Sequence, residues 1–464
     1  MPLNNLDQLH ARHARRDSRL SVGATLTLIW LAGFQSSAAR ADESAGPDGQ
    51  PIPEERWAVH AQATYVEQET DAFPAPYSGP NSLSPSSGRE TADATLYVGA
   101  RLWPGAEGWI TPEIDQGFGL DDTLGVAGFT SGEAYKVGKN QPYLRLPRAF
   151  IRQTFNTGDE REVVEADADQ LRGSRSQDRW VLTLGKFGVT DVFDANRYAH
   201  DPRADFFNWA AVDAGVYDYA ADAWGYTLCA CVERYLGPWT LRAGIFDLSN
   251  IPNSTHLDPG FHEFQYDGEL ERRYGLFGQT GSLRLTLFDS RGRMGLLDQA
   301  LQLASLTGTV PNAADVRQYR GRPGASLDVE QTISADLGVF ARLGKAAGNV
   351  EVYEFTDIDR SVEVGAAIQG TRWHRHDDTI GIVAIDNGIS AVRERYLAAG
   401  GLGVLIGDGR LPHPAAEQIL ETYYRLAVRS GIHLSLDLQH VENPGYNTDR
   451  GPVWVVAVRL HAQY

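Results

Sequence analysis

The chain has 464 residues with 60 acidic and 42 basic side chains, which give it a formal charge of −18 at neutral pH. So acidic a chain would repel a phosphate backbone, which argues against a nucleic-acid partner. Beyond residue 41 no stretch of eighteen apolar residues occurs, which excludes membrane-spanning helices there but not strands, because a spanning strand needs only alternate apolar residues.

The first 41 residues have the three parts of a secretory signal peptide. A basic region from Arg12 to Arg19 precedes an apolar run from Leu20 to Phe34, and Ala39-Arg40-Ala41 supplies small residues for cleavage. The apolar run is shorter than the roughly 20 residues that a spanning helix needs. We therefore expect export and cleavage after residue 41, followed by a Pro- and Gly-rich, flexible lead-in at 42–55.

Most of the remaining chain alternates apolar and polar residues with a period of two, which predicts strands with one apolar and one polar face. The polar faces carry His, Asp, Arg and Gln, so we interpret the apolar faces as lipid-facing and the polar faces as water-facing. The predicted strands are 57–68, 92–103, 109–117, 144–155, 180–187, 223–235, 239–247, 263–277, 282–290, 326–343, 349–356, 362–373, 379–386, 420–428, 432–439 and 454–464.

The longer runs have room for extra strands, and the total is close to sixteen. This number is typical of a porin-sized barrel with a water-filled lumen. The predicted fold class is therefore all-β, a transmembrane antiparallel β-barrel of about 16 strands of the outer-membrane porin type, over residues 56–464.

Several segments interrupt the strand pattern. Long loops are predicted at 118–143 and 188–222, and a charged excursion at 157–177 breaks the strict alternation of short turns and long loops. Residues 294–307 have helical spacing, which indicates a short loop helix that packs on the barrel rather than a plug in the lumen.

Aromatic residues lie at many strand ends, which predicts two girdles at the membrane interfaces, although some of these rings would serve equally well inside the lumen. Cys229 and Cys231 are one residue apart on a predicted strand. At that spacing they point to one face about 7 Å apart, too far for a disulfide, so we interpret them as small buried or lumen-facing residues.

The candidate sugar-contacting residues come from two regions. Arginine and carboxylate side chains bind vicinal hydroxyls in bidentate fashion, a Trp ring offers a stacking surface, and mixed charges suppress ion selectivity. The alternative role for the arginines is to pair with lumen carboxylates and stiffen the barrel. The polar faces of early strands supply Arg101, Trp109, Glu113, Asp115, Arg148 and Arg152, and the loop after Gly185 supplies Asp191, Asp194, Asn196 and Arg203.

The same loop loosely matches a calcium-binding loop, but the spacing and the closing Glu of an EF-hand are missing, so we predict neither a metal nor a cofactor. Paired carboxylates are also typical of glycosidases, and the sequence alone does not separate metal binding from glycosidase catalysis as the role of these side chains.

Five stretches of the chain resemble the carbohydrate-selective porins of the OprB family. They are GKFGVTDVFDANRYAHDPRADFFNWA, DYAADAWGYT, RAGIFD, FDSRGRMG and the ending SLDLQHVENPGYNTDRGPVWVVAVRLHAQY. They occur in the order of the family and cover much of the chain after the leader. The resemblance implies a sixteen-stranded outer-membrane barrel through which glucose and related sugars diffuse.

We therefore expect an outer-membrane porin for passive diffusion of small, glucose-type sugars into the periplasm, without catalysis. An exported or outer-membrane polysaccharide hydrolase is the alternative. The expected partners are small carbohydrates, outer-membrane lipid and the barrel-assembly machinery, which the last strand, ending in Tyr464, would meet as in barrels that this one resembles. The sequence leaves monomer and trimer open.

Overall fold

The computed structural model describes residues 54–134 and 138–464. The expected signal peptide at 1–41 and nearly all of the lead-in at 42–55 lie outside the described residues. Sixteen strands form one closed barrel, in which each strand is antiparallel to both neighbours. They are β1 (Trp57–Thr70), β2 (Gly88–Trp103), β3 (Ala106–Gly117), β4 (Lys139–Asn156), β7 (Arg179–Phe187), β8 (Thr227–Leu236), β9 (Trp239–Asp247), β10 (Phe264–Leu276), β11 (Gln279–Gly295), β12 (Arg317–Ser334), β13 (Leu337–Ala346), β14 (Arg360–Gln369), β15 (Thr379–Gly388), β16 (Glu417–Arg429), β17 (Ile432–Glu442) and β18 (Val453–Gln463).

The remaining elements are short. Strands β5 (Arg161–Val164) and β6 (Gly173–Ser176) pair with each other outside the barrel sheet. The α-helices are α1 (Trp209–Val212), α2 (Leu297–Thr307) and α3 (Ala391–Ala398), and 3-10 turns occupy Leu120–Thr123, Val189–Asp191, Ala313–Val316, Gly370–Trp373 and Pro444–Tyr446. No helix in the described part of the chain is both long and apolar enough to cross a membrane.

The barrel closes where β1 pairs with β18, with Ala63 opposite Ala462. Along β18, Trp454, Val456 and Leu460 are exposed on the outside, while Arg459 and His461 on either side of Leu460 are buried inside. Closure leaves no strand edge unpaired, so backbone polar groups within the membrane are satisfied by neighbouring strands. The predicted barrel of about 16 strands is confirmed.

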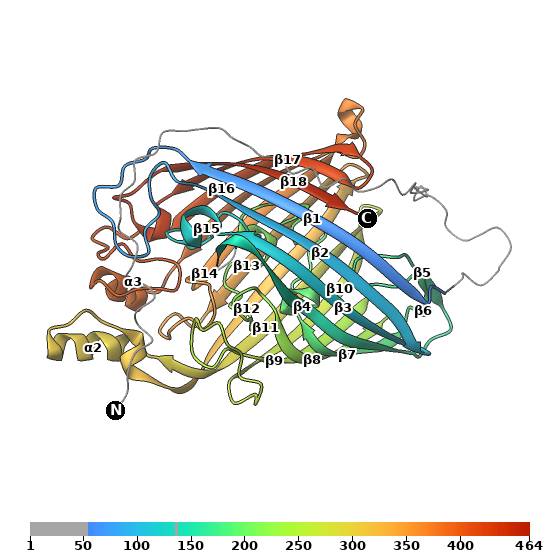
Figure 1. Cartoon of the computed structure of the whole chain (residues 1–464), viewed down its shortest axis with the longest axis horizontal. Coiled ribbons are helices and arrows are strands. Elements are labelled where there is room, and N and C mark those ends of the chain that lie inside the picture. The colour runs from blue at the N-terminus through green and yellow to red at the C-terminus, as the bar shows by residue number, and fades with distance from the viewer. Residues whose placement is uncertain (1–53, 135–137) are drawn as a thin grey trace. The chain divides into compact units, whose positions relative to one another are not determined.

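The two ends of the barrel differ in their connections (Figure 1). At one end, the turn end, most hairpins close with two residues, as at Ser430-Gly431, where Gly431 has a φ of +73° that favours glycine. The predicted excursion between β4 and β7 lies at this end and contains β5 and β6. Long loops connect the strands at the other end, the loop end, which faces outward in bacterial outer-membrane barrels.

The Trp side chains divide between the outside and the inside of the barrel. Trp57, Trp103 and Trp180 are 67%, 51% and 45% exposed at the turn ends of their strands, as an interfacial girdle requires. Trp109 and Trp209 are instead buried inside. Exposure therefore separates the two uses that their positions in the sequence leave open.

The strand predictions at 326–343 and 349–356 are corrected by the structure. Residues 349–356 form no barrel strand but belong to the loop between β13 and β14. Their apolar side chains, including Val350 and Phe355, belong to a buried cluster, and Phe355 packs against Trp209 and Tyr219 of another loop. The period-two pattern does not distinguish such burial from a sheet face. The predicted strand 326–343 contains parts of two strands, β12 and β13, joined by a short turn.

Helix α2 forms where helical spacing predicts it and lies beyond the ends of the strands (Figure 1). Leu297 and Ala300 are buried, Leu306 is 85% exposed, and Asp298 Oδ1 lies 3.2 Å from Arg395 Nη2 of α3. The helix therefore packs among loops and contributes no plug to the lumen cavity described below.

Candidate permeation site

The long loop between β7 and β8 folds into the lumen of the barrel. Residues 188–226, which we call the inner loop, leave β7 and cross to strands on the opposite side of the ring before returning to β8. Carboxylates on both the near and the far side of the barrel wall hold its backbone. Glu421 of β16 accepts a hydrogen bond from the Asn208 amide at 3.1 Å, and Glu269 of β10 accepts one from the Asp194 amide at 2.8 Å.

Arginines of the wall bind the carbonyl groups of the same loop. Arg342 of β13 donates to the carbonyls of Ala199 at 2.7 Å and Ala211 at 2.8 Å. It also pairs with Asp328 at 3.1 Å and Glu363 at 2.9 Å, so this fully buried cation is compensated on all sides. Such charge-assisted hydrogen bonds fix the loop rather than leave it free in the lumen.

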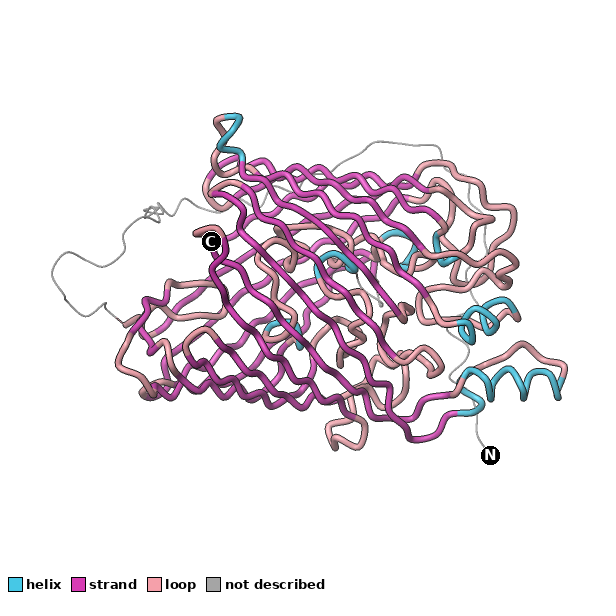
Figure 2. Tube along the Cα trace, turned by 180° about the vertical axis from the view of Figure 1, so that it is seen from behind, coloured by secondary structure: helices cyan, strands magenta, loops and turns pink. Residues whose placement is uncertain are grey.

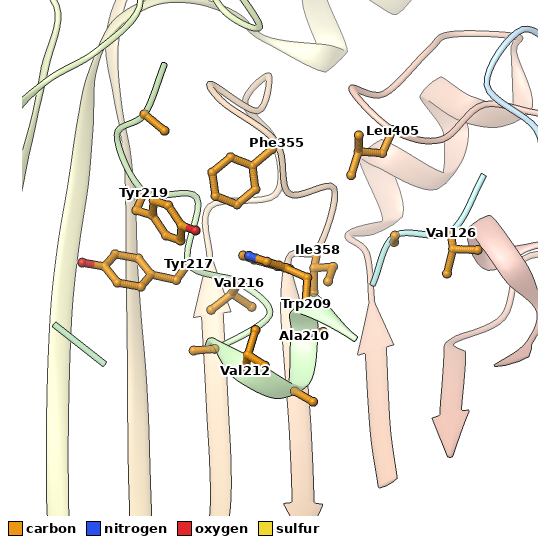
Figure 3. Close-up of a cluster of buried hydrophobic side chains, with 14 of the residues drawn as sticks. Val126, Trp209, Ala210, Val212, Val216, Tyr217, Tyr219, Phe355, Ile358 and Leu405 are labelled. Atoms are coloured by element: carbon orange, nitrogen blue, oxygen red, sulfur yellow. The ribbon is translucent and has the colours of Figure 1, made fainter. Parts of the chain in front are cut away.

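Loop segments lie within the ring of strands (Figure 2), and two further loops pack against the inner loop (Figure 3). Trp209 makes an edge contact with Phe355, with ring centroids 5.1 Å apart, and stacks on Phe129 at 5.3 Å. The Asp218 carboxylate accepts hydrogen bonds from the amides of Tyr353 and Phe355 at 2.8 and 2.9 Å. The loops at 126–133 and 347–358 thus form one packed unit with the inner loop.

A cavity of about 620 Å³ remains in the lumen. Its wall comes from β1, β2, β4, β7 and β8, from the inner loop and the loop at 126–133, and from the excursion between β4 and β7. Charged and aromatic groups share this wall, and those that bear on the argument are Tyr97, Arg148, Arg152, Asp169, Asp191, Arg203, Trp224, Tyr226 and Tyr235.

The strongest charged contact in this cavity joins Arg148 and Asp191. Arg148 Nε and Nη2 lie 2.7 and 2.6 Å from the two carboxylate oxygens, a bidentate pair, and its guanidinium lies 4.9 Å from the centre of the Tyr226 ring. Burial alone would raise the pKa of Asp191, but Arg148 outweighs it and holds that pKa below its ordinary value. The pair is therefore ionised at neutral pH, next to an aromatic face.

Asp169 approaches the same arginine from the excursion, with its Oδ2 3.4 Å from Arg148 Nε. Burial raises the pKa of Asp169 to about 6, although Arg148 acts in the opposite direction. This carboxyl group therefore titrates just below neutral pH.

Arg203 of the inner loop lies between three carboxylates. Its Nη2 is 3.5 Å from both Asp93 and Glu113, and its Nε is 3.2 Å from Glu133. Burial alone would lower the pKa of Arg203, but these carboxylates more than offset it and the pKa is raised above its ordinary value. The cation is permanent and is held against the early strands.

Four of the ten predicted site residues line the cavity, and they are Arg148, Arg152, Asp191 and Arg203. Arg152 donates from Nη1 to the Asp169 carbonyl at 2.8 Å and its guanidinium lies 5.0 Å from the centre of the Phe150 ring. The two regions chosen from the sequence therefore meet in one place.

The other six predicted residues do not line the cavity. Arg101 donates to the Glu55 carbonyl at 3.2 Å near the turn end. Trp109 points inward but packs on the wall, stacked with His60 at 6.3 Å and donating from Nε1 to Glu107 at 3.2 Å. Its ring is not exposed to the cavity as a sugar-stacking platform.

Four acidic or amide residues of that group serve the structure. Glu113 and Asp115 both pair with Arg145 of β4, which matches the predicted alternative of arginine–carboxylate stiffening. Asp194 accepts a hydrogen bond from the Ala214 amide at 2.6 Å, and Asn196 Nδ2 donates to Asp328 at 2.9 Å. The last two hold the inner loop in shape.

Several residues that line the cavity are not among the site residues predicted from the sequence. The predicted strand 223–235 begins only at Thr227, so Trp224 and Tyr226 belong to the inner loop and line the cavity. Cys229 and Cys231 are free and face inward, as predicted.

Arg145 and Arg148 both point inward although they are three residues apart, because a shift of register opposite Thr111 and Glu113 breaks the alternation in β4.

No group of three or more His, Cys, Asp or Glu side chains within the described residues is arranged to hold a metal ion. The cavity wall itself presents aromatic faces and charged groups of both signs that pair with each other.

The chain has a fold similar to that of a solved OprB structure. It superposes on the high-pH structure of Pseudomonas putida OprB with a TM-score of 0.65 and 15% identity, over 88% of this chain and 94% of that one. The low-pH structure of the same protein gives a TM-score of 0.47 at 12% identity, over 88% and 93% of the two chains. The outer-membrane channel DcaP of Acinetobacter baumannii gives 0.45 at 11% identity, over 94% and 100%. A search of curated protein sequences found no match.

The family comparison is more specific than these likenesses of fold. The model of the carbohydrate-selective porin, OprB family, matches residues 84–464, which span every barrel strand but β1. The chain therefore belongs to the OprB family of carbohydrate-selective porins.

Proposed function

We propose that this protein lets small, neutral, glucose-type sugars diffuse passively through the outer membrane into the periplasm. The observation that carries the proposal is the bidentate Arg148–Asp191 pair beside the Tyr226 ring in the lumen cavity. The two charged groups present donors and acceptors to adjacent sugar hydroxyls, and the aromatic ring presents a flat face to the apolar side of a pyranose.

The size and charge of the cavity fit such a solute. At about 620 Å³ it falls within the usual range of small-molecule sites. Since Arg148 and Arg203 are each balanced by carboxylates, a neutral solute meets local hydrogen-bonding groups without a strong net charge that would favour one type of ion. Transport requires binding weak enough for release, and mutual pairing of the charges limits how strongly they hold a sugar.

Asp191→Asn tests this assignment. The variant keeps the shape of the side chain but removes the charge that fixes Arg148, so we expect sugar to reduce the ion current through single channels in planar bilayers less than it does in the wild type. Asp336→Asn is the matched control, because Asp336 pairs with Arg372 at 2.7 Å in an exposed turn away from the cavity. An unchanged response of Asp191→Asn to glucose would remove the pair from the proposed site.

We further propose export by the signal peptide at 1–41, cleavage before the lead-in, and recognition of the last strand, ending in Tyr464, by the barrel-assembly machinery. Monomer or trimer formation is open. The alternative of a polysaccharide hydrolase predicts release of reducing sugar from glycosides, which the purified protein should not produce.

A further inference from the structure

The outer wall of the barrel contains a groove of about 290 Å³ on strands β11 to β15. Its apolar side is a row of cross-strand partners, with Leu285 opposite Leu327, Leu327 opposite Leu343, and Leu343 opposite Val362. Leu343 and Val362 are 50% and 44% exposed. The neighbouring residues Arg342 and Glu363 are buried in the lumen, so the groove faces the lipid side.

The next row toward the loop end changes character from apolar to cationic. It places Ala325 opposite Lys345, and Lys345 opposite Arg360. Ala325 of β12 lies between Lys345 of β13 and Leu287 of β11, and Leu287 is 53% exposed. Because the Ala325 side chain is small, it leaves a depression between these two longer side chains. The three residues Ala325, Lys345 and Arg360 form one end of the groove, and we call them the cationic end.

Two cations directly opposite each other on an antiparallel pair repel, which is unfavourable unless an anion lies between or beside them. Asp386 supplies one negative charge to Arg360, with its Oδ1 3.6 Å from Arg360 Nη1. Lys345 has no carboxylate oxygen within 4 Å in the described parts of the chain. The cationic end therefore has an unmet requirement for negative charge.

The position of the groove identifies where that charge comes from. Arg360 is the first residue of β14 and Lys345 lies next to the last residue of β13, both at the loop end. In an outer-membrane barrel this end meets the head groups of the outer leaflet, while the leucine row lies deeper among acyl chains. The cationic end thus lies where an anionic head group would be, and the leucine row lies where the acyl chain of the same lipid would be.

We propose that this groove binds a phosphorylated, multiply acylated lipid of the outer leaflet, of the lipopolysaccharide type. Its phosphate pairs with Lys345 and Arg360, and one acyl chain passes over Ala325 and along the leucine row. A free phosphate ion would use the cations alone, whereas the lipid also requires the depression at Ala325.

Native mass spectrometry of the full mature protein, extracted in mild detergent and titrated with purified lipid A, tests the proposal. Lys345→Ser with Arg360→Ser should weaken binding by about fivefold for each cation removed, as expected for charges near a lipid surface. Ala325→Phe fills the depression without changing charge and should also weaken lipid A binding, while leaving any binding of inorganic phosphate unchanged.

Arg272→Ser is the matched control. Arg272 faces outward on β10 at the turn end, 5.1 Å from the centre of the Trp239 ring, so its loss should leave lipid A binding intact. Each variant should retain single-channel conductance, which shows that the barrel is folded. Equal binding by the wild type, the double variant and Ala325→Phe would overturn the proposal, and so would equally tight binding of zwitterionic phosphatidylethanolamine by the wild type.

Discussion

Arg148 is held from two sides, by Asp191 of the inner loop and by Asp169 of the excursion at the turn end. These two segments come from opposite ends of the barrel, so one guanidinium links them across the cavity. The sequence predicts Arg148 and Asp191 as site residues from their polar character. It does not predict Asp169, because nothing in a charged excursion indicates which of its carboxylates points inward.

The raised pKa of Asp169 leads to a pH-dependent prediction. With a pKa of about 6 the carboxyl group is mostly ionised at pH 7.5 and becomes protonated as the pH falls through that value. Acidification to about pH 5 therefore removes one negative charge from the cavity wall while Arg148 stays charged. The reversal potential in a KCl gradient should shift toward anion selectivity over this range.

Asp169→Asn should at pH 7.5 already show much of the ion selectivity that the wild type acquires at pH 5. Asp159→Asn, an exposed change in the same excursion, should keep the pH-dependent shift of the wild type. A pH response in Asp169→Asn equal to that of the wild type would show that other carboxylates account for it.

At the scale of elements, the inner loop is the feature that determines the cavity. Period-two alternation predicts the barrel strands because each must present one face to lipid and one to the lumen. No comparable rule governs residues 188–226, whose conformation depends on carboxylates and arginines contributed by distant strands. Trp224 and Tyr226 show the difference, since their alternation resembles a strand while the structure places them on the cavity wall.

Arg342→Ala tests whether those wall contacts hold the inner loop. The change removes hydrogen bonds to the Ala199 and Ala211 carbonyls and leaves Asp328 and Glu363 buried without this cation. Breaking a buried ion pair in this way costs about 3–5 kcal/mol. We expect a lower unfolding temperature in detergent and a larger, noisier single-channel conductance as the loop loosens.

Arg372→Ala removes an arginine from an exposed pair and should change neither property appreciably. If Arg342→Ala also left both the unfolding temperature and the conductance unaltered, the inner loop would owe its position to apolar packing around Trp209 instead.

For the whole molecule, the fold follows from the sequence more directly than the site does. The alternation in β18, with Trp454 and Val456 outside and Arg459 inside, is repeated from strand to strand and leads to a closed sheet. Errors occur where loops bury apolar residues, as at 349–356, or where a bulge changes which residues face inward, as at Arg145 in β4. Loop burial and the bulge both depend on tertiary contacts, which the alternation of apolar and polar residues along one strand does not reveal.

We propose that the barrel is a passive pore that prefers sugars, and liposome swelling tests this proposal most directly. Proteoliposomes containing the wild-type protein should swell faster in isotonic glucose than in an amino acid of equal size, without any energy source. Equal rates for both solutes would reduce the protein to an unselective channel, and no swelling in either would contradict the account.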